Sequence, residues 1–266
     1  MNLGDMPDLP DGLPEARSAR PMAGGDVAAV WDVTLMDGRR VVVKTGGGDP
    51  DLEAEGLQAL AAAGAPTPAV LAQSDRTLVL EYVDGPAAGW EELGRALASV
   101  HRASSDRFGW HRDNLIGSLP QANDATTNWP EFYLEYRLRP WLACLPGVLR
   151  GRLERAMARA LPALLERDVV PSLVHGDLWS GNVVAGRWLI DPAVHYADRE
   201  LDFAMLDLFG SIPASMQAGY DAIWPLDPGW QERRPALQIY HLLVHVRLFG
   251  SSYCGAVSAR LDALGV

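Results

Sequence analysis

Cysteine is scarce in this sequence of 266 residues, and basic residues are fewer than acidic ones. Its two cysteines, Cys144 and Cys254, cannot form a disulfide framework, and no CxxC pair suggests a metal site. Lys and Arg number 23 against 34 Asp and Glu, so the formal net charge is −11. This acidic balance argues against a nucleic-acid partner and against binding to anionic membranes.

Long apolar runs and leader-like patterns are also missing. No window of about 18 apolar residues occurs, so we expect no transmembrane helix. Residues 1–20 contain several Asp, Glu and Pro and no apolar core, so we expect no secretory signal, a loosely held terminus and a cytoplasmic protein. With 48% hydrophobic and 21% charged residues, the chain should nevertheless bury a sizeable core.

The first third of the chain alternates short β-type runs with turn signals. Residues 28–35 and 40–44 are two such runs, and the Asp37-Gly38 pair between them is typical of a hairpin turn. Residues 77–82, which read TLVLEY, form a third run. This part of the chain is therefore predicted to be rich in β-structure.

One helix is expected between the second and third of these runs. The Asp-Pro pair at residues 49–50 suits its start and Gly64 suits its end. Glu53 shares a helix face with leucines four and seven residues later, so its carboxylate should point inward and needs a partner. Glu55 points elsewhere and is interpreted as a solvated side chain.

After the Gly- and Pro-containing segment at residues 84–89, the pattern becomes mainly helical. Helices are expected over residues 90–102, 129–145, 151–167, 200–209 and 235–249. Short β-type runs within residues 173–190 interrupt them. We therefore predict an α+β fold with two lobes, a small β-rich lobe with one helix and a larger helical one. The proposed limits are 1–84 for the first lobe, 85–90 for a hinge and 91–266 for the second lobe.

The most informative stretch is residues 173–191, LVHGDLWSGNVVAGRWLID. It places His175, Asp177, Asn182 and Asp191 among short apolar runs. The runs after Asn182 and before Asp191 flank an Ala-Gly-Arg turn, so these two residues should lie at paired ends of a hairpin. Their side chains can then converge on one metal ion.

Phosphoryl transfer is the chemistry that uses such a set. An Asp orients the attacking hydroxyl, an Asn and a second Asp hold Mg²⁺, and a strand Lys paired with a helix Glu binds the phosphates. Asp177 precedes Asn182 by five residues, as in the kinase loop H-R-D-x-x-x-x-N, with Gly176 in place of the Arg. Lys44 ends the run VVVK, and Glu53 faces inward on the next helix. These independent features agree.

Several stretches resemble the fructosamine kinase (ketosamine-3-kinase) family of the protein-kinase-like aminoglycoside phosphotransferase group. They are HGDLWSGN followed by IDPA and RELDFAMLDLFG, together with FGWHRDNLIGSLPQ, WPEFYLEYRLRP and WPLDPGW. The resemblance runs from about residue 24 to the C-terminus. It implies a bilobal protein-kinase-like fold. It also implies phosphorylation of a sugar hydroxyl on a ketoamine or glycated amine by ATP and Mg²⁺, as a step of deglycation repair.

The same resemblance implies a role for each matching residue. Asp177 would be the catalytic base, and Asn182 and Asp191 would bind Mg²⁺. The nucleotide would be bound by Lys44 with its anchor Glu53, by Gly24, Gly25, Asp26 and Val27 over the phosphates, and by Glu81, Tyr82 and Val83 around the adenine. Trp179 and His175 are candidate substrate contacts, although His175 is better interpreted as a hydrogen-bonding brace of its loop. Asp202 matches a position that supports this loop.

Two features depart from the family pattern. Residues 196–200 read YADRE where Y-G-H-x-E is common, and the Gly24-Gly25 turn lacks a full G-x-G-x-x-G. Two alternatives therefore stay open, a kinase of an aminoglycoside or amino alcohol and a nucleotide-binding regulatory module without catalysis. His241 and His245 have helical i, i+4 spacing but no evident third ligand, so they are interpreted as core or surface residues. The oligomeric state is not indicated.

Overall fold

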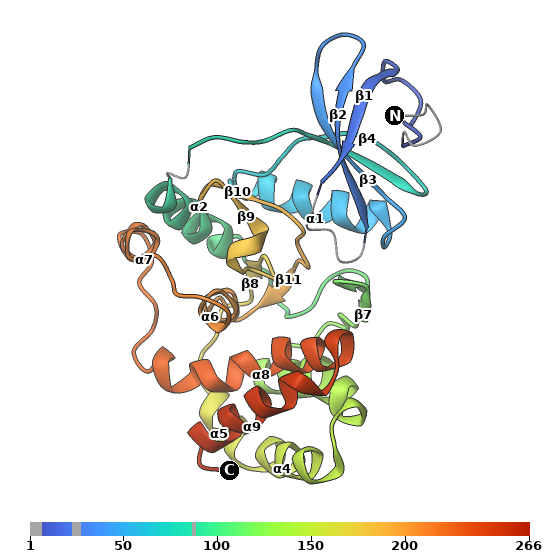
Figure 1. Cartoon of the computed structure of the whole chain (residues 1–266). Helices are drawn as coiled ribbons and strands as arrows, with labels where there is room; N and C mark the ends of the chain where they lie inside the picture. The colour runs from blue at the N-terminus through green and yellow to red at the C-terminus, as the bar shows by residue number, and fades with distance from the viewer. Residues whose placement is uncertain (1–6, 23–27, 87–88) are drawn as a thin grey trace.

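The computed structural model describes residues 7–22, 28–86 and 89–266, which form two lobes (Figure 1). The smaller lobe contains a five-stranded antiparallel sheet in the order β1-β2-β3-β5-β4. Its strands are β1 (Ala16–Pro21), β2 (Ala29–Leu35), β3 (Arg40–Thr45), β4 (Val70–Ser74) and β5 (Thr77–Glu81). The three predicted runs are confirmed as β2, β3 and β5. The expectation of a loose terminus is wrong for residues 16–20, because they form β1 and pair with β2.

The hairpin between β2 and β3 has the predicted turn. Gly38 adopts a φ of +89°, a conformation that side chains with a Cβ rarely take. Alternate residues of the two strands, among them Val33 and Val41, are fully buried in the core of this lobe. The two-residue periodicity of the sequence therefore sets which face of the sheet is covered.

Helix α1 (Pro50–Ala62) has the predicted ends. The side chain of Asp49 accepts a hydrogen bond from the Asp51 N–H at 3.0 Å, and Pro50 occupies the first turn. Beyond the helix, Gly64 has a φ of +96°, which lets the chain reverse as in a helix C-cap. Leu57 is buried, so the predicted inward face is confirmed.

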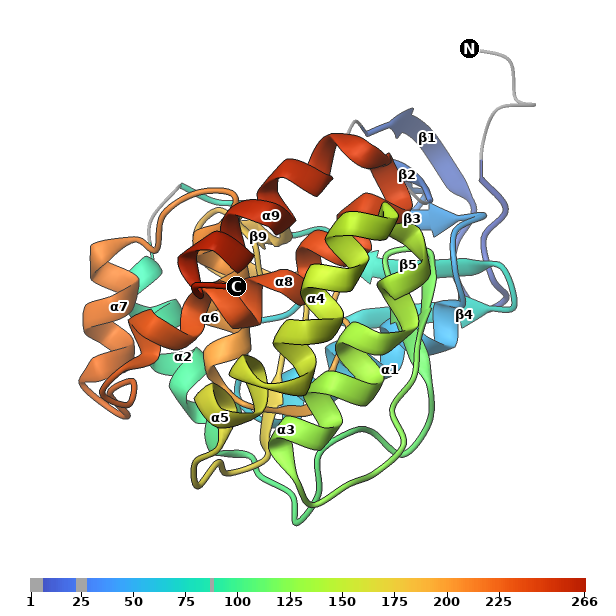
Figure 2. The same cartoon turned by 90° about the horizontal axis from the view of Figure 1, so that it is seen from below.

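The larger lobe is built mainly from helices. They are α2 (Trp90–Arg102), α3 (Trp129–Phe132), α4 (Gly147–Ala158), α5 (Ala160–Leu165), α6 (Glu200–Leu208), α7 (Ala214–Asp221), α8 (Trp230–Phe249) and α9 (Cys254–Ala263). The short strands are β6 (Asn114–Ile116), β7 (Leu119–Gln121), β8 (Ser172–Val174), β9 (Val183–Val184), β10 (Trp188–Leu189) and β11 (His195–Ala197). Helix α8 is mostly buried and packs against α6 and α9, and the view from below shows α4 beside α9 (Figure 2).

Several helices differ from the expectation. The helix predicted over residues 129–145 is divided into α3, a π-helix at Tyr133–Leu138 and a 3₁₀ segment at Arg139–Cys144. Pro140 has no N–H for the helical ladder, which favours this change of winding. The helix predicted over 151–167 is broken between α4 and α5, and α7 and α9 are not among the predicted helices.

The hinge stays a prediction, because residues 87–88 lie outside the described part of the chain. Within residues 7–22, 28–86 and 89–266, no helix combines the length and the apolar character that crossing a membrane requires.

Two glycines allow α2 and α7 to pack at backbone contact. A Cβ on Gly94 would lie 2.1 Å from the carbonyl oxygen of Met216, and a Cβ on Gly219 would lie 2.0 Å from that of Glu91. We therefore expect Gly94→Ala to lower the free energy of unfolding by about 2 kcal/mol, since steric strain outweighs the gain in helix propensity.

Gly255→Ala provides the matched control for chemical denaturation. Gly255 lies on an exposed side of α9, and a Cβ at this position would have no atom of the described residues within 4 Å. This variant should be as stable as the wild type or more stable by up to about 1 kcal/mol. Equal stability of the two variants would contradict the close packing of α2 on α7.

Candidate active site

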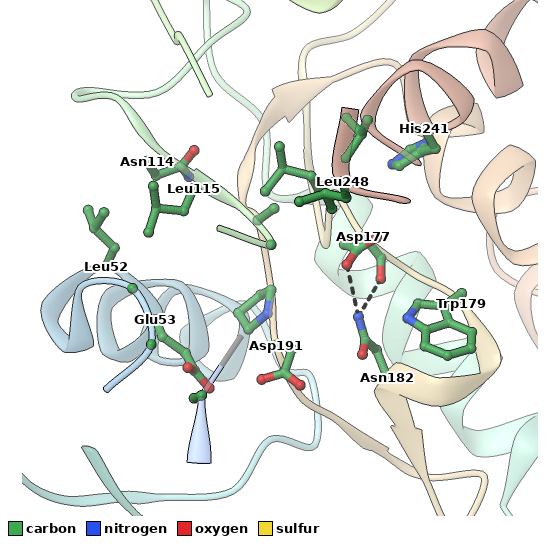
Figure 3. Close-up of a pocket in the computed structure, with 18 of the residues that line it drawn as sticks. Leu52, Glu53, Asn114, Leu115, Asp177, Trp179, Asn182, Asp191, His241 and Leu248 are labelled. Carbon is green, nitrogen blue, oxygen red and sulfur yellow. Dashed lines mark hydrogen bonds between the residues drawn. The ribbon is translucent and has the colours of Figure 1, made fainter. Parts of the chain in front are cut away.

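A cavity of about 240 Å³ lies between the two lobes (Figure 3). The smaller lobe contributes residues of β2, β3 and α1, and the larger lobe contributes residues of β6, the segment 177–193 and α8. The side chains that bear on its chemistry are Lys44, Glu53, Asn114, Asp177, Trp179, Asn182, Asp191, His241 and His245. The cavity therefore gathers residues from both lobes around the predicted motif.

Lys44 is held by carboxylates of both lobes. Its Nζ lies 2.6 and 2.7 Å from the two carboxylate oxygens of Glu53 on α1, and it also contacts Asp191. Burial alone would lower the pKa of Lys44, but the two carboxylates outweigh it and raise that pKa. Burial likewise opposes ionisation of Asp191, yet the Lys44 charge holds the pKa of Asp191 below its usual range. The inward direction predicted for Glu53 is confirmed.

Glu55 ties the same helix to the larger lobe. Its carboxylate accepts a hydrogen bond from Trp110 Nε1 at 2.5 Å and forms ion pairs with His111 and Arg112. The interpretation of Glu55 as a merely solvated side chain is therefore wrong. Nearby, a Cβ on Gly56 would lie 2.9 Å from Pro192, so α1 sits directly on the segment that follows Asp191.

Asp177 lies on the wall of the cavity, close to Asn182. The Asn182 side-chain amide donates hydrogen bonds to the Asp177 backbone carbonyl at 2.8 Å and to Oδ2 of its carboxylate at 3.2 Å. Burial raises the pKa of Asp177 to about 7, and the hydrogen bond from Asn182 only partly opposes this. This side chain can therefore act as a proton acceptor close to neutral pH.

Asp202 on α6 fixes the backbone before Asp177. Its fully buried carboxylate accepts hydrogen bonds from the N–H groups of His175 and Gly176 at 2.8 and 2.9 Å, and lies 3.1 Å from His101 Nε2. Gly176 has a φ of +83°, and a Cβ there would lie 2.1 Å from the Ala193 carbonyl oxygen. Only glycine fits this position, which explains why the Arg of the protein-kinase loop is replaced here.

His175 connects the two chain segments that carry the acidic residues. Its Nε2 lies 2.9 Å from the carbonyl oxygen of Ile190, and its Nδ1 accepts a hydrogen bond from the Asp177 N–H at 3.2 Å. The side chain is fully buried and does not line the cavity. The structure therefore places His175 behind the loop and outside the lining of the cavity, where its hydrogen bonds brace the loop.

Asn182 and Asp191 flank the predicted hairpin of β9 and β10. The Ile190 N–H donates to the Asn182 carbonyl at 3.1 Å, which brings the two ends together. Asp191 has a φ of +54°, a conformation that Asp tolerates better than most residues. Both side chains line the cavity and offer oxygen atoms, the ligand type that Mg²⁺ prefers.

The other residues predicted to contact the nucleotide either lie outside the described residues or do not line the cavity. Gly24, Gly25, Asp26 and Val27 lie outside the described residues. Glu81 is exposed and accepts a hydrogen bond from the Ala69 N–H at 3.3 Å. The ring of Tyr82 lies 3.5 Å beneath the Arg40 guanidinium. Neither of these residues nor Val83 lines the cavity.

Trp179 lines the cavity next to the loop of Asp177, as the view of the site shows (Figure 3). Its ring is 39% exposed and covers Gly181, where a Cβ would lie 2.2 Å from the indole. The exposed aromatic face is therefore available to a flat or sugar-like ligand.

Sequence reasoning missed part of the cavity wall. Asn114 and Leu115 of β6 and His241, His245 and Leu248 of α8 also line the cavity. The helical spacing of the two histidines placed them on one face, but nothing in the sequence distinguishes a cavity face from a core face on a buried helix.

Three comparisons bear on the identity of the chain. Residues 11–264 match the family model described as fructosamine kinase. A probable ketoamine kinase of Synechocystis is 39% identical over 76% of this chain and 73% of its own. A crystal structure of a candidate fructosamine-3-kinase from Thermobifida fusca is 35% identical, covers 94% of each chain and has a TM-score of 0.87.

A more distant structural neighbour shows the fold alone. Amicoumacin kinase is 15% identical, with a TM-score of 0.61 over 95% of this chain and 90% of its own. The two lobes are thus those of the kinase-like fold. The family match covers nearly the whole chain, and the curated relative agrees with it in sequence. The chain belongs to the fructosamine kinase family.

Proposed function

We propose that this phosphotransferase transfers the terminal phosphate of ATP to a sugar hydroxyl of a ketoamine. The observation that carries the proposal is the convergence of Lys44, Asp177, Asn182 and Asp191 on one cavity between the lobes. The names of the relatives, ketoamine kinase and fructosamine-3-kinase, support the substrate class. A phosphate on the sugar would destabilise the adduct, so the proposed biological role is deglycation repair.

Asp177 would orient the attacking hydroxyl and accept its proton. Its raised pKa of about 7 suits this role, because a base of that strength is ionised enough to accept a proton and basic enough to hold it. Asn182 fixes one carboxylate oxygen, which leaves the other toward the cavity. Lys44, held by Glu53, would neutralise charge on the phosphates. Catalysis would then rest on positioning and electrostatics.

The residues present fit a magnesium ion. Asn182 and Asp191 would hold it, and when bound it would neutralise phosphate charge. No cluster of three or more His, Cys, Asp or Glu suited to a metal occurs among residues 7–22, 28–86 and 89–266. Such a sparse site suits Mg²⁺, which commonly binds through one or two protein oxygens together with substrate phosphates and water. Amicoumacin kinase was crystallised with AMP-PNP and Ca²⁺, which supports nucleotide and cation binding on this fold.

The substrate class is tested by ADP release with Mg²⁺-ATP. The acceptors are fructosyl-lysine, ribulosyl-lysine, an aminoglycoside, choline and a plain hexose. We expect turnover on the ketoamines and a loss of about 10³-fold in kcat for Asp177→Asn, because the proton acceptor is removed. A variant with more than about a tenth of wild-type activity would defeat the role of Asp177. Turnover of choline or the aminoglycoside alone would favour the other metabolite kinases, and ATP binding without any turnover would favour a regulatory module.

The Lys44–Glu53 pair is tested by Glu53→Gln. We expect kcat/KM to fall at least about tenfold, since Lys44 loses a charged partner and is no longer held toward the phosphates. Asp51→Asn makes the same charge change on the same helix, but Asp51 is exposed and contacts Gln73. This control should keep its activity within about threefold. Similar losses of kcat/KM in both variants would show that the charge of the helix matters, rather than the Lys44–Glu53 pair.

The support that Asp202 gives to the loop before Asp177 is tested by Asp202→Asn. We expect the free energy of unfolding to fall by about 3 kcal/mol at neutral pH, because the amide cannot replace a buried carboxylate that accepts several hydrogen bonds. Burial opposes ionisation, but hydrogen bonds and charge from His101 outweigh it and lower the pKa of Asp202 below 3.8. The stabilisation is therefore present above pH 3.8 and is lost as the pH falls through the folded-state pKa.

Denaturant unfolding at several pH values checks this expectation. The gap between wild type and Asp202→Asn should be constant near neutral pH and should narrow below pH 3.8. A gap that does not depend on pH would show that Asp202 contributes by packing and not by its charge.

A further inference from the structure

A buried histidine on α8 lines the part of the cavity beyond Asp177. His241 is 1% exposed, and its ring contributes to the cavity wall. Figure 3 shows it on the side of Asp177 and Leu248, away from Glu53 and Asp191. His241 therefore lies in the half of the cavity where the phosphate acceptor would bind, and none of the roles assigned above uses it.

The hydrogen bonds of His241 define its tautomer. Its Nε2 lies 2.8 Å from the carbonyl oxygen of Gly176, and because a carbonyl only accepts, this nitrogen must carry the hydrogen. The other nitrogen, Nδ1, then bears a lone pair. It is buried and has no hydrogen-bond partner among the described residues. Burial lowers the pKa of His241 to about 4, so the ring is neutral at neutral pH.

His245, one turn further along α8, has the same character. Its Nδ1 lies 2.7 Å from the carbonyl oxygen of His241 and therefore carries the hydrogen, which leaves Nε2 as an acceptor. Burial also lowers the pKa of His245. Two neutral imidazoles thus offer acceptor nitrogens along one helix face of the cavity wall.

Asn114, a side-chain amide of the same cavity wall, does not donate to His241 Nδ1. Asn114 donates to the Val194 carbonyl at 2.7 Å, and its own oxygen accepts from Gln121 at 2.8 Å and from Asn123 at 2.9 Å. Its polar atoms are thus already engaged. A buried acceptor without a donor is unfavourable, so a ligand that donates to Nδ1 gains binding free energy from that hydrogen bond.

The residues around His241 indicate which kind of ligand can donate a hydrogen bond to Nδ1. Lys44 is the only Lys or Arg among the described residues that line the cavity, and two carboxylates already hold it. An anionic acceptor substrate therefore finds no free cation here. Leu248 and Val244 form the adjoining wall. Nδ1 is buried in this structure, so a ligand that reaches it has to displace the atoms around it. The uncharged sugar part of a ketoamine, with several hydroxyl donors beside apolar carbons, fits such a wall.

We propose that His241 is a specificity-determining residue whose Nδ1 accepts a hydrogen bond from a second sugar hydroxyl of the ketoamine substrate. The reacting hydroxyl lies at Asp177, and the carbonyl that His241 contacts belongs to Gly176, the residue directly before it. One loop thus connects Asp177, which would orient the attacking hydroxyl, to His241, which would recognise a second hydroxyl of the same substrate. This inference rests on the proposed function, because it deepens the identity of the ketoamine substrate.

Two substitutions separate recognition from structural support. In His241→Gln the side-chain amide nitrogen can replace Nε2 and donate to Gly176, but the acceptor at Nδ1 is lost. In His241→Asn an amide oxygen can take the place of Nδ1, but the hydrogen bond to Gly176 is lost. We expect His241→Gln to raise KM for fructosyl-lysine about tenfold with KM for ATP unchanged. We expect His241→Asn to lower kcat, because the Gly176 carbonyl beside Asp177 loses its donor, while KM for fructosyl-lysine rises less than in His241→Gln. The opposite order would show that His241 only supports the loop.

A set of fructosyl-lysine analogues, each lacking a different hydroxyl, identifies the hydroxyl that donates to His241 Nδ1. Wild type should lose about tenfold in kcat/KM on one analogue, and His241→Gln should not distinguish that analogue from the parent. Equal penalties in the two proteins for every analogue would overturn the proposal.

A binding measurement keeps the inference separate from the proposed activity. The ¹⁵N NMR signal of His241 Nδ1 is followed while fructosyl-lysine is added to Asp177→Asn with AMP-PNP and Mg²⁺. A shift supports the inference, even if wild type turns over no ketoamine and the proposed function fails. Turnover without a shift overturns the inference alone. The absence of both turnover and a shift overturns both.

Discussion

The Lys44 ammonium group lies between two carboxylates and links the two lobes at the cavity. Lys44 comes from β3, Glu53 from α1 and Asp191 from the segment after β10, so one cation joins three elements across the cavity. Without it, the neighbouring carboxylates of Glu53 and Asp191 would repel each other. Glu55 and Gly56 secure the same helix to the larger lobe by other contacts. The charge cluster therefore forms on a helix whose place is already fixed.

A second network places Asp177 with respect to this cluster. Asp202 accepts hydrogen bonds from the backbone on one side of the loop, and His175 joins the loop to the carbonyl before Asp191. Side chains deep in the larger lobe therefore set the separation of Asp177 from Asp191. This arrangement explains why the fully buried carboxylate of Asp202 stays ionised. Both of its oxygen atoms accept hydrogen bonds, which favour the charged form over the protonated one.

Much of this could be predicted from the sequence, because local signals determine it. The cap at Asp49, the Asp37-Gly38 turn and the spacing of Asp177 and Asn182 each depend on a few neighbouring residues. The partners of Glu55 could not be predicted, because they lie some 55 residues further along the chain. The free nitrogen of His241 also escaped prediction, since it depends on a carbonyl 65 residues away. The π-helix at Tyr133–Leu138 could not be predicted from local sequence either, because its buried Arg137 donates hydrogen bonds to carbonyl and amide groups outside the helix.

The two halves of the cavity differ in how they can select a ligand. Around Lys44 the described lining carries three carboxylates, those of Asp49, Glu53 and Asp191, against one ammonium group. Free ATP would meet a net negative field there, whereas a cation bound to its phosphates offsets that excess. Beyond Asp177, the part of the cavity beside α8 has neutral imidazoles and apolar side chains, so its selectivity has to come from the hydrogen-bond donors and the shape of the ligand. With the proposed function, charge would govern entry of the nucleotide, and the pattern of hydroxyl groups would govern the choice of acceptor.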